Sequence, residues 1–278
     1  MENTRITPVN FIKLLKKRCV EDQISEYAYH ITYSLLLSFF PFIIFLMTLI
    51  GYMDLDSSVV LTALENYFPQ NVYLLVSEII TDVIDKQRDG LMSFSILFSV
   101  YAASGGFRAF VNASNRAMRV KEERHIILLY LQSFFWVVLF AFVILLSLAG
   151  IVFGEQILNL VYRYYKPYGN NKLLHIFRVI IPEIMIFVLF LCFYMFVPAR
   201  KVCFKCAITG TVFTTSSWII FTMLFQLYVN NYANYSRFYG TLGAVVALLL
   251  WLLLTSTIML IGVEINALLM ELKITSPD

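Results

Sequence analysis

The fold is decided by residues 238–263, which read FYGTLGAVVALLLWLLLTSTIMLIGV and contain no Asp, Glu, Lys or Arg. A helix needs about 20 apolar residues to cross a bilayer, so this stretch is long enough to be a membrane span. Its apolar residues are continuous and do not alternate with polar ones, which favours a helix over a strand of a membrane barrel. Other charge-free stretches of 18 residues or more cover residues 27–53, 90–107, 125–154 and 206–236.

The composition also indicates a membrane protein. Of the 278 residues, 60% are apolar and only 14% are charged, whereas soluble domains carry about 25% charged residues. This excludes an ordinary soluble enzyme, a disordered chain and a secreted disulfide scaffold. The formal net charge of +3 is small, so bulk charge gives no indication of nucleic-acid binding.

We predict an all-α membrane protein built as a six-helix transmembrane bundle. The run at 173–197 contains Arg178 and Glu183 but is long enough to cross. The predicted spans are residues 31–53, 91–111, 126–153, 173–197, 207–229 and 240–269. Residues 1–30 are mixed and polar, and the first apolar run has no small-residue cleavage pattern, so it is expected to remain in the mature protein.

Lys and Arg in the loops predict that both termini are cytoplasmic. With the N-terminus inside, 14 basic residues fall on the cytoplasmic side and 6 outside, leaving Arg178 within a span. The first outer loop, residues 54–90, agrees because it contains seven acidic and two basic residues. Residues 270–278 then form a cytoplasmic tail.

An amphipathic helix is predicted over residues 7–28, within the cytoplasmic segment 1–30. It carries an apolar stripe of Val9, Ile12, Leu15 and Cys19, and its basic residues, which lie mostly off this stripe, are Lys13, Lys16, Lys17 and Arg18. Such a helix can lie on an anionic inner leaflet. Alternatively, it only packs under the bundle.

The first outer loop is too long to be without structure. Residues 58–67 and 71–86 are predicted to form two helices, broken at Pro69. They would form either a lid over an outward cavity or a pair of helices packed on the outer ends of the spans.

Ionised side chains at membrane depth cost about 2.5–3.5 kcal/mol by insertion scales, so they usually face protein or water. Arg108 and Glu264 lie near the inner ends of two spans, so an Arg108–Glu264 ion pair is geometrically allowed. Glu183 lies near the midplane, where proton coupling or substrate binding competes with a simple interhelical hydrogen bond. Arg178 can reach the outer interface with its long side chain.

The first predicted span carries Tyr33, Ser34, Ser38 and Pro41. Ser34 and Ser38 are four residues apart and share a face, and Pro41 frees a backbone carbonyl group. This helix is therefore a candidate to line a polar cavity. The alternative is that the hydroxyl groups only satisfy the kink or join neighbouring helices.

No cofactor or metal site is predicted. The four cysteines (Cys19, Cys192, Cys203 and Cys206) lie on or near the reducing cytoplasmic side, so we expect plain thiols. The single CxxC motif at 203–206 leaves redox or metal chemistry as the alternative. The three histidines show no spacing typical of paired metal ligands, and no Gly precedes a Lys, so a Walker A loop is absent.

Two stretches resemble the YihY/BrkB family of bacterial membrane proteins, once called ribonuclease BN-like. Residues 28–41 read AYHITYSLLLSFFP, where the family has an aromatic stretch leading to Leu-x-Ser-x-Phe-Pro. The last span opens with YGTLGA at 239–244 and closes with GVEINA at 262–267. There the family has Tyr-Gly-Ser-Leu-Gly-Ala and Gly-Ala-Glu-Leu-Asn-Ala. Residues 104–116 resemble the family more loosely.

The resemblance implies six spans and a bacterial plasma-membrane location. It adds weight to Glu264, Asn266, Ser38 and Pro41 without assigning a reaction. Transport or lipid export has been proposed for members of the family.

We therefore expect a transporter or a translocase of lipids or other amphipathic substrates, without its own ATPase. The alternative is a structural or assembly protein with no transported substrate. An enzyme, including a ribonuclease, is not expected, because the cytoplasmic segments are too short to fold a catalytic domain. The expected partners are membrane lipids, with a homo-oligomer left open and no nucleic acid.

Overall fold

The computed structural model describes residues 8–52, 61, 73, 74, 77, 89–164, 171–231 and 241–275. Within these ranges the chain is helical and contains no strand. The helices are α1 (Pro8–Glu21), α2 (Ile24–Tyr52), α5 (Asp89–Ala117), α6 (Ile126–Tyr164), α7 (Asn171–Phe196), α8 (Phe204–Asn231) and α10 (Thr241–Thr275).

Among the described residues, four helices are long and apolar enough to cross a membrane. Their qualifying segments are Ile24–Ile44, Ile126–Val143, Phe204–Val229 and Val245–Leu272, and α7 contributes a shorter apolar segment, Ile180–Phe196. The predicted six-helix bundle is thus supported in part, as an all-helical membrane protein. The crossing of all six helices and the cytoplasmic location of both termini remain predictions.

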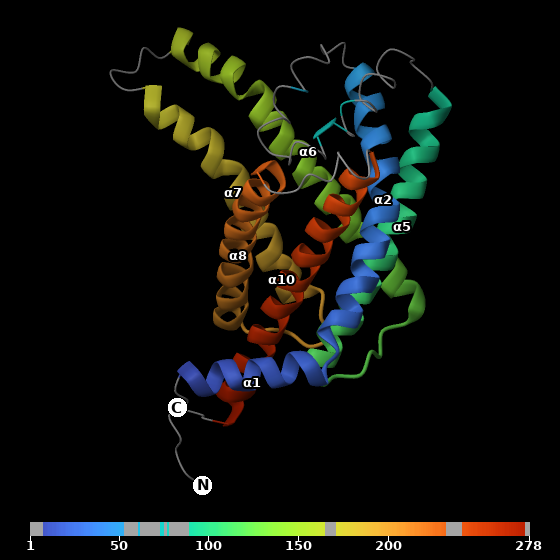
Figure 1. Ribbon diagram of the computed structural model, residues 1–278, viewed down its shortest axis with the longest axis vertical. Coiled ribbons are helices and arrows are strands. Elements are labelled where there is room, and N and C mark those ends of the chain that lie inside the picture. Colours follow the sequence, from blue (N-terminus) through green and yellow to red (C-terminus); the bar gives the residue numbers. More distant parts are fainter. Residues whose placement is uncertain are drawn as a thin grey trace.

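The long helices run side by side, and α1 lies across one end of them (Figure 1). Helix α10 packs against both α8 and α2, and α2 packs along α5. Helices α6 and α7 form a further pair, whose far halves lean away from the other helices. The last turn of α10 lies at the end where α1 crosses, so the first and last helices meet there (Figure 1).

The amphipathic helix is shorter than predicted. It ends at Glu21, because Gln23 adopts a left-handed conformation with φ of 56°. The amide of Asp22 donates to the Arg18 carbonyl at 2.8 Å, and α2 then begins at Ile24, earlier than the predicted residue 31. The prediction of one helix over 7–28 was therefore wrong. No glycine or proline marks this turn, so it has no local signal in the sequence.

Aromatic rings fill the core between α5, α6 and α7. Phe193 lies 4.4 Å from Phe110 and 5.4 Å from Trp136, measured between ring centroids. Such pairs add about 0.5–1.5 kcal/mol beyond the area that they bury. This core lies in the half of the bundle nearer to α1, and it holds the ends of three helices together.

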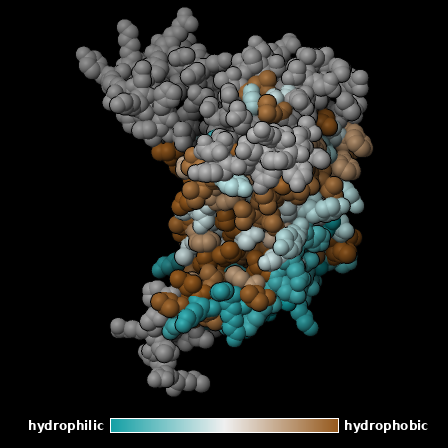
Figure 2. Space-filling model, viewed as in Figure 1, coloured by the Kyte–Doolittle hydropathy of each residue, from teal (hydrophilic) through white to brown (hydrophobic). Residues whose placement is uncertain are grey.

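The surface around the middle of the bundle is apolar, and the hydrophilic surface gathers at the end where α1 lies (Figure 2). Exposed apolar side chains of this belt include Leu97, Phe135, Ile220 and Leu254. A soluble protein rarely exposes so large an apolar surface, whereas a membrane protein presents it to lipid.

The first outer loop is mostly outside the described residues, and the last helix is longer than predicted. The helices predicted at 58–67 and 71–86 lie outside the described residues, apart from helical Leu61, Tyr73, Leu74 and Ser77. At the other end of the chain, α10 continues past the predicted boundary at 269 as far as Thr275.

Candidate functional site

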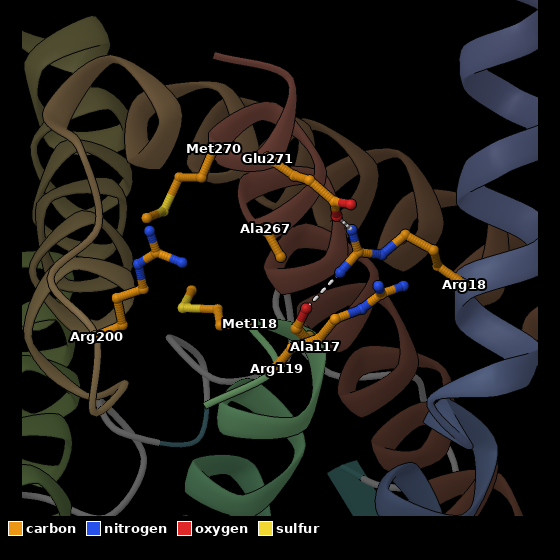
Figure 3. A pocket seen from close by; sticks show the side chains of 8 residues that line it. All are labelled: Arg18, Ala117, Met118, Arg119, Arg200, Ala267, Met270 and Glu271. Carbon is orange, nitrogen blue, oxygen red and sulfur yellow. Dashed lines mark hydrogen bonds and ion pairs between the residues drawn. The ribbon is translucent and has the colours of Figure 1, made fainter. Parts of the chain in front are cut away.

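Arg18 and Glu264 form a buried ion pair where α1 crosses the end of α10. The Arg18 Nε atom lies 3.2 Å from Glu264 Oε2, and only 4% and 0% of the two side chains are exposed. Arg18 also donates from Nη1 to Glu271 Oε2 at 2.5 Å, and from Nη2 to the Ala117 carbonyl (Figure 3). One guanidinium group therefore links α1 to α10 and to the end of α5.

The carboxyl groups around this pair are not fully satisfied. Within the described part of the chain, Glu264 Oε1 and Asp22 Oδ2 are both buried without a hydrogen-bond partner. The Asp22 carboxylate acts electrostatically on both Glu264 and Cys19. Burial first, and then the Glu264 and Asp22 carboxylates, raise the pKa of the Cys19 thiol to about 11. The carboxyl groups of Asp22 and Glu264 therefore lie close enough to interact where α1 ends.

Asn266 and two glycines hold α8 close to α10. The Gly210 amide donates to Asn266 Oδ1 at 3.0 Å. A Cβ atom at Gly210 would lie only 2.1 Å from that oxygen, and one at Gly262 would lie 2.1 Å from Thr214 Oγ1. Small residues allow this close approach of backbones, as is typical of helix packing in membranes.

Tyr194 completes the polar contacts between α7, α8 and α10. Its hydroxyl group donates to the Met259 carbonyl at 2.8 Å and lies 2.7 Å from Thr214 Oγ1. Because a buried hydroxyl without a partner is costly, these contacts fix the tyrosine at one position.

A pocket of about 240 Å³ opens beside the ion pair. Arg200 extends into it from the side opposite Arg18, with Met270 beside Arg200 and Met118 nearer the middle of the view (Figure 3). The side chains that line it are Arg18, Ala117, Met118, Arg119, Arg200, Ala267, Met270 and Glu271. The pocket therefore combines positive charge with an apolar wall.

A hydrogen-bonded clamp holds together the two loops that supply Arg119 and Arg200. Glu122 accepts from Arg124 Nε at 2.7 Å and from Nη2 at 2.6 Å. Asn115 donates to Glu122 Oε2 at 2.6 Å and accepts from the Ala199 amide at 2.8 Å. The hydrogen bonds from Arg124 lower the pKa of Glu122 below its ordinary value of 4.5.

Glu264 and Asn266, both predicted as site residues, are fully buried near this pocket. Arg108 is not the partner of Glu264. Its Nη1 atom donates to Ser104 Oγ at 3.0 Å, and its guanidinium group lies 4.4 Å from the centroid of the Tyr130 ring. The predicted Arg108–Glu264 pair was therefore wrong. Arg18 is the partner of Glu264, because α1 folds across the end of the bundle and brings Arg18 next to it.

Glu183 is exposed on the surface of α7, next to the exposed apolar residues Ile180 and Ile184. No hydrogen bond joins its side chain to another of the described residues, so the interhelical hydrogen bond weighed for it is not found. Arg178 lies in α7, but its side chain falls outside the described residues.

The polar residues of α2 mostly serve packing. Ser34 is buried against Gly105 and Gly106 of α5, and Ser38 donates to the Leu35 carbonyl at 2.9 Å. Tyr33 is 62% exposed, and Pro41 is partly buried within the helix. These contacts favour the packing alternative over a polar cavity along α2.

Cys203 and Cys206 form a disulfide, so the expectation of plain thiols was wrong for this pair. Proximity explains the difference, because the start of α8 brings the two sulfur atoms together. Cys19 and Cys192 are free thiols, as expected.

The sequence matches the family called Virulence factor BrkB over residues 15–277. The chain belongs to the BrkB family. YfkH of Bacillus subtilis, called ribonuclease-like, is 33% identical over 268 residues, which cover 95% of this chain and 97% of that protein. A UPF0761 membrane protein of Alteromonas mediterranea is 28% identical over 261 residues, covering 92% and 86% of the two chains. No solved structure matches.

The matched BrkB region includes Arg18, which sequence reasoning missed as a site residue. Arg18 was grouped with the basic residues expected to lie off the apolar stripe. In the structure, Val9 and Ile12 of the apolar stripe are exposed, whereas Arg18 is buried. The sequence held one weak indication of this role. Glu264, an acid at the inner end of a span, calls for a cationic partner nearby.

Proposed function

We propose that this chain is a multi-pass plasma-membrane protein that moves a lipid or other amphipathic substrate across the bilayer, without an ATPase of its own. In the orientation with both termini inside, α1 and the pocket face the cytoplasm. The observation that carries the proposal is the buried Arg18–Glu264 pair, which fastens α1 to α10 beside an open pocket.

A buried ion pair is an unusual way to fasten two helices. Removing two charges from water costs several kcal/mol per ion, and an apolar contact of similar volume is often at least as stable. An ion pair can, however, separate when water and a competing charge reach it. The pair is thus suited to a contact that opens and closes, and we assign α1 the role of a gate held closed by Arg18 and Glu264.

The surroundings of the gate suit an amphipathic substrate. Arginines on the pocket wall can bind an anionic head group, and Met118 and Met270 can contact its apolar part. Lipids enter and leave such a site sideways from the leaflet in which α1 would lie.

Energy coupling has to come from an ion gradient, a partner or the substrate gradient itself, because the chain has no Walker A loop. Glu264 is better suited to couple protons than Glu183, since it is buried beside Arg18 whereas Glu183 is exposed on α7.

Fluorescent lipid in proteoliposomes tests the proposal. Vesicles with labelled phosphatidylglycerol are treated with dithionite, which bleaches only the outer leaflet, so inner label is lost only when lipid moves. The wild-type protein is expected to increase this loss over protein-free vesicles. Equal rates would contradict transport and favour a structural or assembly role.

Two variants test the gate in the same assay. Glu264→Gln weakens the contact that holds α1, so downhill lipid movement is expected to rise about tenfold, as the coupling energies of close charge pairs imply. Glu271→Gln is the matched control, because Glu271 contacts the same arginine but is 49% exposed. The same rate in both variants would contradict a gate held by Glu264.

A ribonuclease activity is the less favoured alternative. The ribonuclease-like name belongs to the Bacillus subtilis relative, and we propose that this chain is not an enzyme. Cleavage of RNA by the purified protein, lost in Glu264→Gln, would overturn this view.

A further inference from the structure

We infer that the pocket beside α1 binds the phosphate group of an anionic phospholipid, held between Arg119 and Arg200. The inference deepens the proposed function and rests on it for the direction of substrate movement. Inorganic phosphate carries the same chemistry, so the two sources have to be separated by experiment.

The charges of the pocket leave two arginines available. Arg18 is paired with two carboxylates, those of Glu264 at 3.2 Å and Glu271 at 2.5 Å, so its charge is not available to an anion. Arg119 and Arg200 also line the pocket, and within the described ranges neither side chain forms a hydrogen bond or an ion pair. Both are exposed. Figure 3 shows Arg200 on one side of the pocket and Arg119 extending towards Arg18 on the other, so an anion inside the pocket would lie between two guanidinium groups that are unpaired within those ranges.

Asn115 fixes the backbone beside both arginines. Its carbonyl oxygen accepts from the Val120 amide at 2.9 Å, directly after Arg119, and its Oδ1 accepts from the Ala199 amide at 2.8 Å, directly before Arg200. Arg119 itself is held in a left-handed conformation with φ of 54°. Residues other than glycine seldom adopt this region, so the surrounding contacts impose it.

A guanidinium group matches two phosphate oxygens with two parallel N–H donors. The hydrogen bonds of Asn115 fix the backbone on which both arginines stand, so only the side chains have to be ordered when the phosphate binds. The phosphate is therefore the chemical group that this pair of arginines fits.

The remaining wall favours a phospholipid as the source of the phosphate. Met118, Ala267 and Met270 present apolar surface next to the arginines. On α1, Val9, Ile12 and Val20 are exposed together with basic side chains, which is typical of a helix at the level of lipid head groups. The pocket opens at this same end, so its mouth would lie where phospholipid phosphates lie.

Calorimetric titration of the full chain in phosphatidylcholine nanodiscs tests the inference. The probes are dihexanoyl phosphatidic acid, inorganic phosphate and dihexanoyl phosphatidylcholine. We expect dihexanoyl phosphatidic acid to bind most tightly. The double variant Arg119→Gln/Arg200→Gln is expected to lose at least about tenfold in affinity for it, since it loses two sets of charge-assisted hydrogen bonds.

Lys121→Gln/Lys201→Gln is the matched control. It removes two positive charges from the same two loops, but neither lysine lines the pocket. We expect it to retain wild-type affinity and the arginine variant to keep the wild-type melting temperature.

Unchanged affinity in the arginine variant, or an equal loss in the control, would overturn the phosphate site. Inorganic phosphate binding as tightly as dihexanoyl phosphatidic acid would overturn a phospholipid as the source. Because binding is measured without transport, failure of this inference is distinguishable from failure of the proposed function.

Discussion

At the scale of single residues, Gly210 and Gly262 allow α8 and α10 to approach closely. An alanine Cβ at either position would lie 2.1 Å from a buried oxygen atom, which belongs to Asn266 or to Thr214. We predict that Gly210→Ala and Gly262→Ala each lower the free energy of unfolding by about 1–3 kcal/mol, a typical cost of overpacking. Thermal unfolding in detergent measures it.

Gly105→Ala is the control for this prediction, because its Cβ would lie 3.1 Å from Ser34 Oγ, a less severe contact. An equal loss of stability in all three variants would contradict the prediction that the α8–α10 contact is the tighter one.

The Arg18–Glu264 pair predicts strong coupling between two residues that are 246 positions apart. Removing one partner leaves a buried charge, so Arg18→Met and Glu264→Gln should each cost about 3–5 kcal/mol of stability. The double variant should cost less than the sum of the two, and the difference is the coupling energy. Unfolding in a titration with sodium dodecyl sulfate measures all three.

Lys17→Met, a neighbouring exposed position on α1, should leave stability unchanged. Additive losses in the Arg18 and Glu264 variants would contradict the buried pair.

Sequence reasoning at this scale found Glu264 and Asn266, because an acid and an amide deep in an apolar run have few satisfactory environments. It did not find Arg18, because an arginine in a basic segment is usually a solvated charge. For Glu183 it left proton coupling, substrate binding and an interhelical hydrogen bond open, and the structure exposes that side chain on α7. The surroundings of such residues depend on contacts between elements that are distant in the sequence. Residue spacing along the chain does not reveal these contacts.

At the scale of helices and loops, the clamp around Glu122 predicts a dependence of stability on pH. Arg124 lowers the pKa of Glu122 below 4.5 in the folded state. The unfolded chain therefore binds the proton more readily, and the stabilisation is complete above the unfolded pKa. It is lost as the pH falls below 4.5 through the folded pKa.

We predict that the melting temperature falls more steeply for the wild-type protein than for Glu122→Gln when the pH is lowered to about 3. Differential scanning fluorimetry measures it. Glu123→Gln, at the exposed neighbouring position, should follow the wild-type curve. Parallel curves for the wild type and Glu122→Gln would contradict the clamp.

The apolar runs predicted the positions of the long helices, because a hydrophobic stretch of bilayer length is stable in a membrane mainly as a helix. The turn between α1 and α2 was not predictable in the same way. Gln23 adopts its left-handed conformation because α1 is held across the bundle by Arg18. The disulfide of Cys203 and Cys206 was also missed, because compartment reasoning ignored how closely the start of α8 brings these residues.

At the scale of the whole molecule, the membrane character and the BrkB family follow directly from sequence, whereas the proposed gate rests on how α1 packs. Helix α1 contacts α2 and α10 and crosses the end of the bundle. Arg18 lies in the last turn of α1, and Cys19 beside it packs against the core, so the part of α1 that could swing is the part before Arg18. Hinged opening of this kind is a common form of switching.

The movement of α1 can be measured directly as a distance between spin labels by electron–electron double resonance. Labels replace the exposed residues Lys13 on α1 and Lys205 on α8, after the four native cysteines are removed. In nanodiscs we predict one distance for the unliganded protein. A second, longer distance should be populated when dihexanoyl phosphatidic acid is added or when Glu264 is replaced by Gln. A single unchanged distance in every sample would contradict a gate held by the Arg18–Glu264 pair.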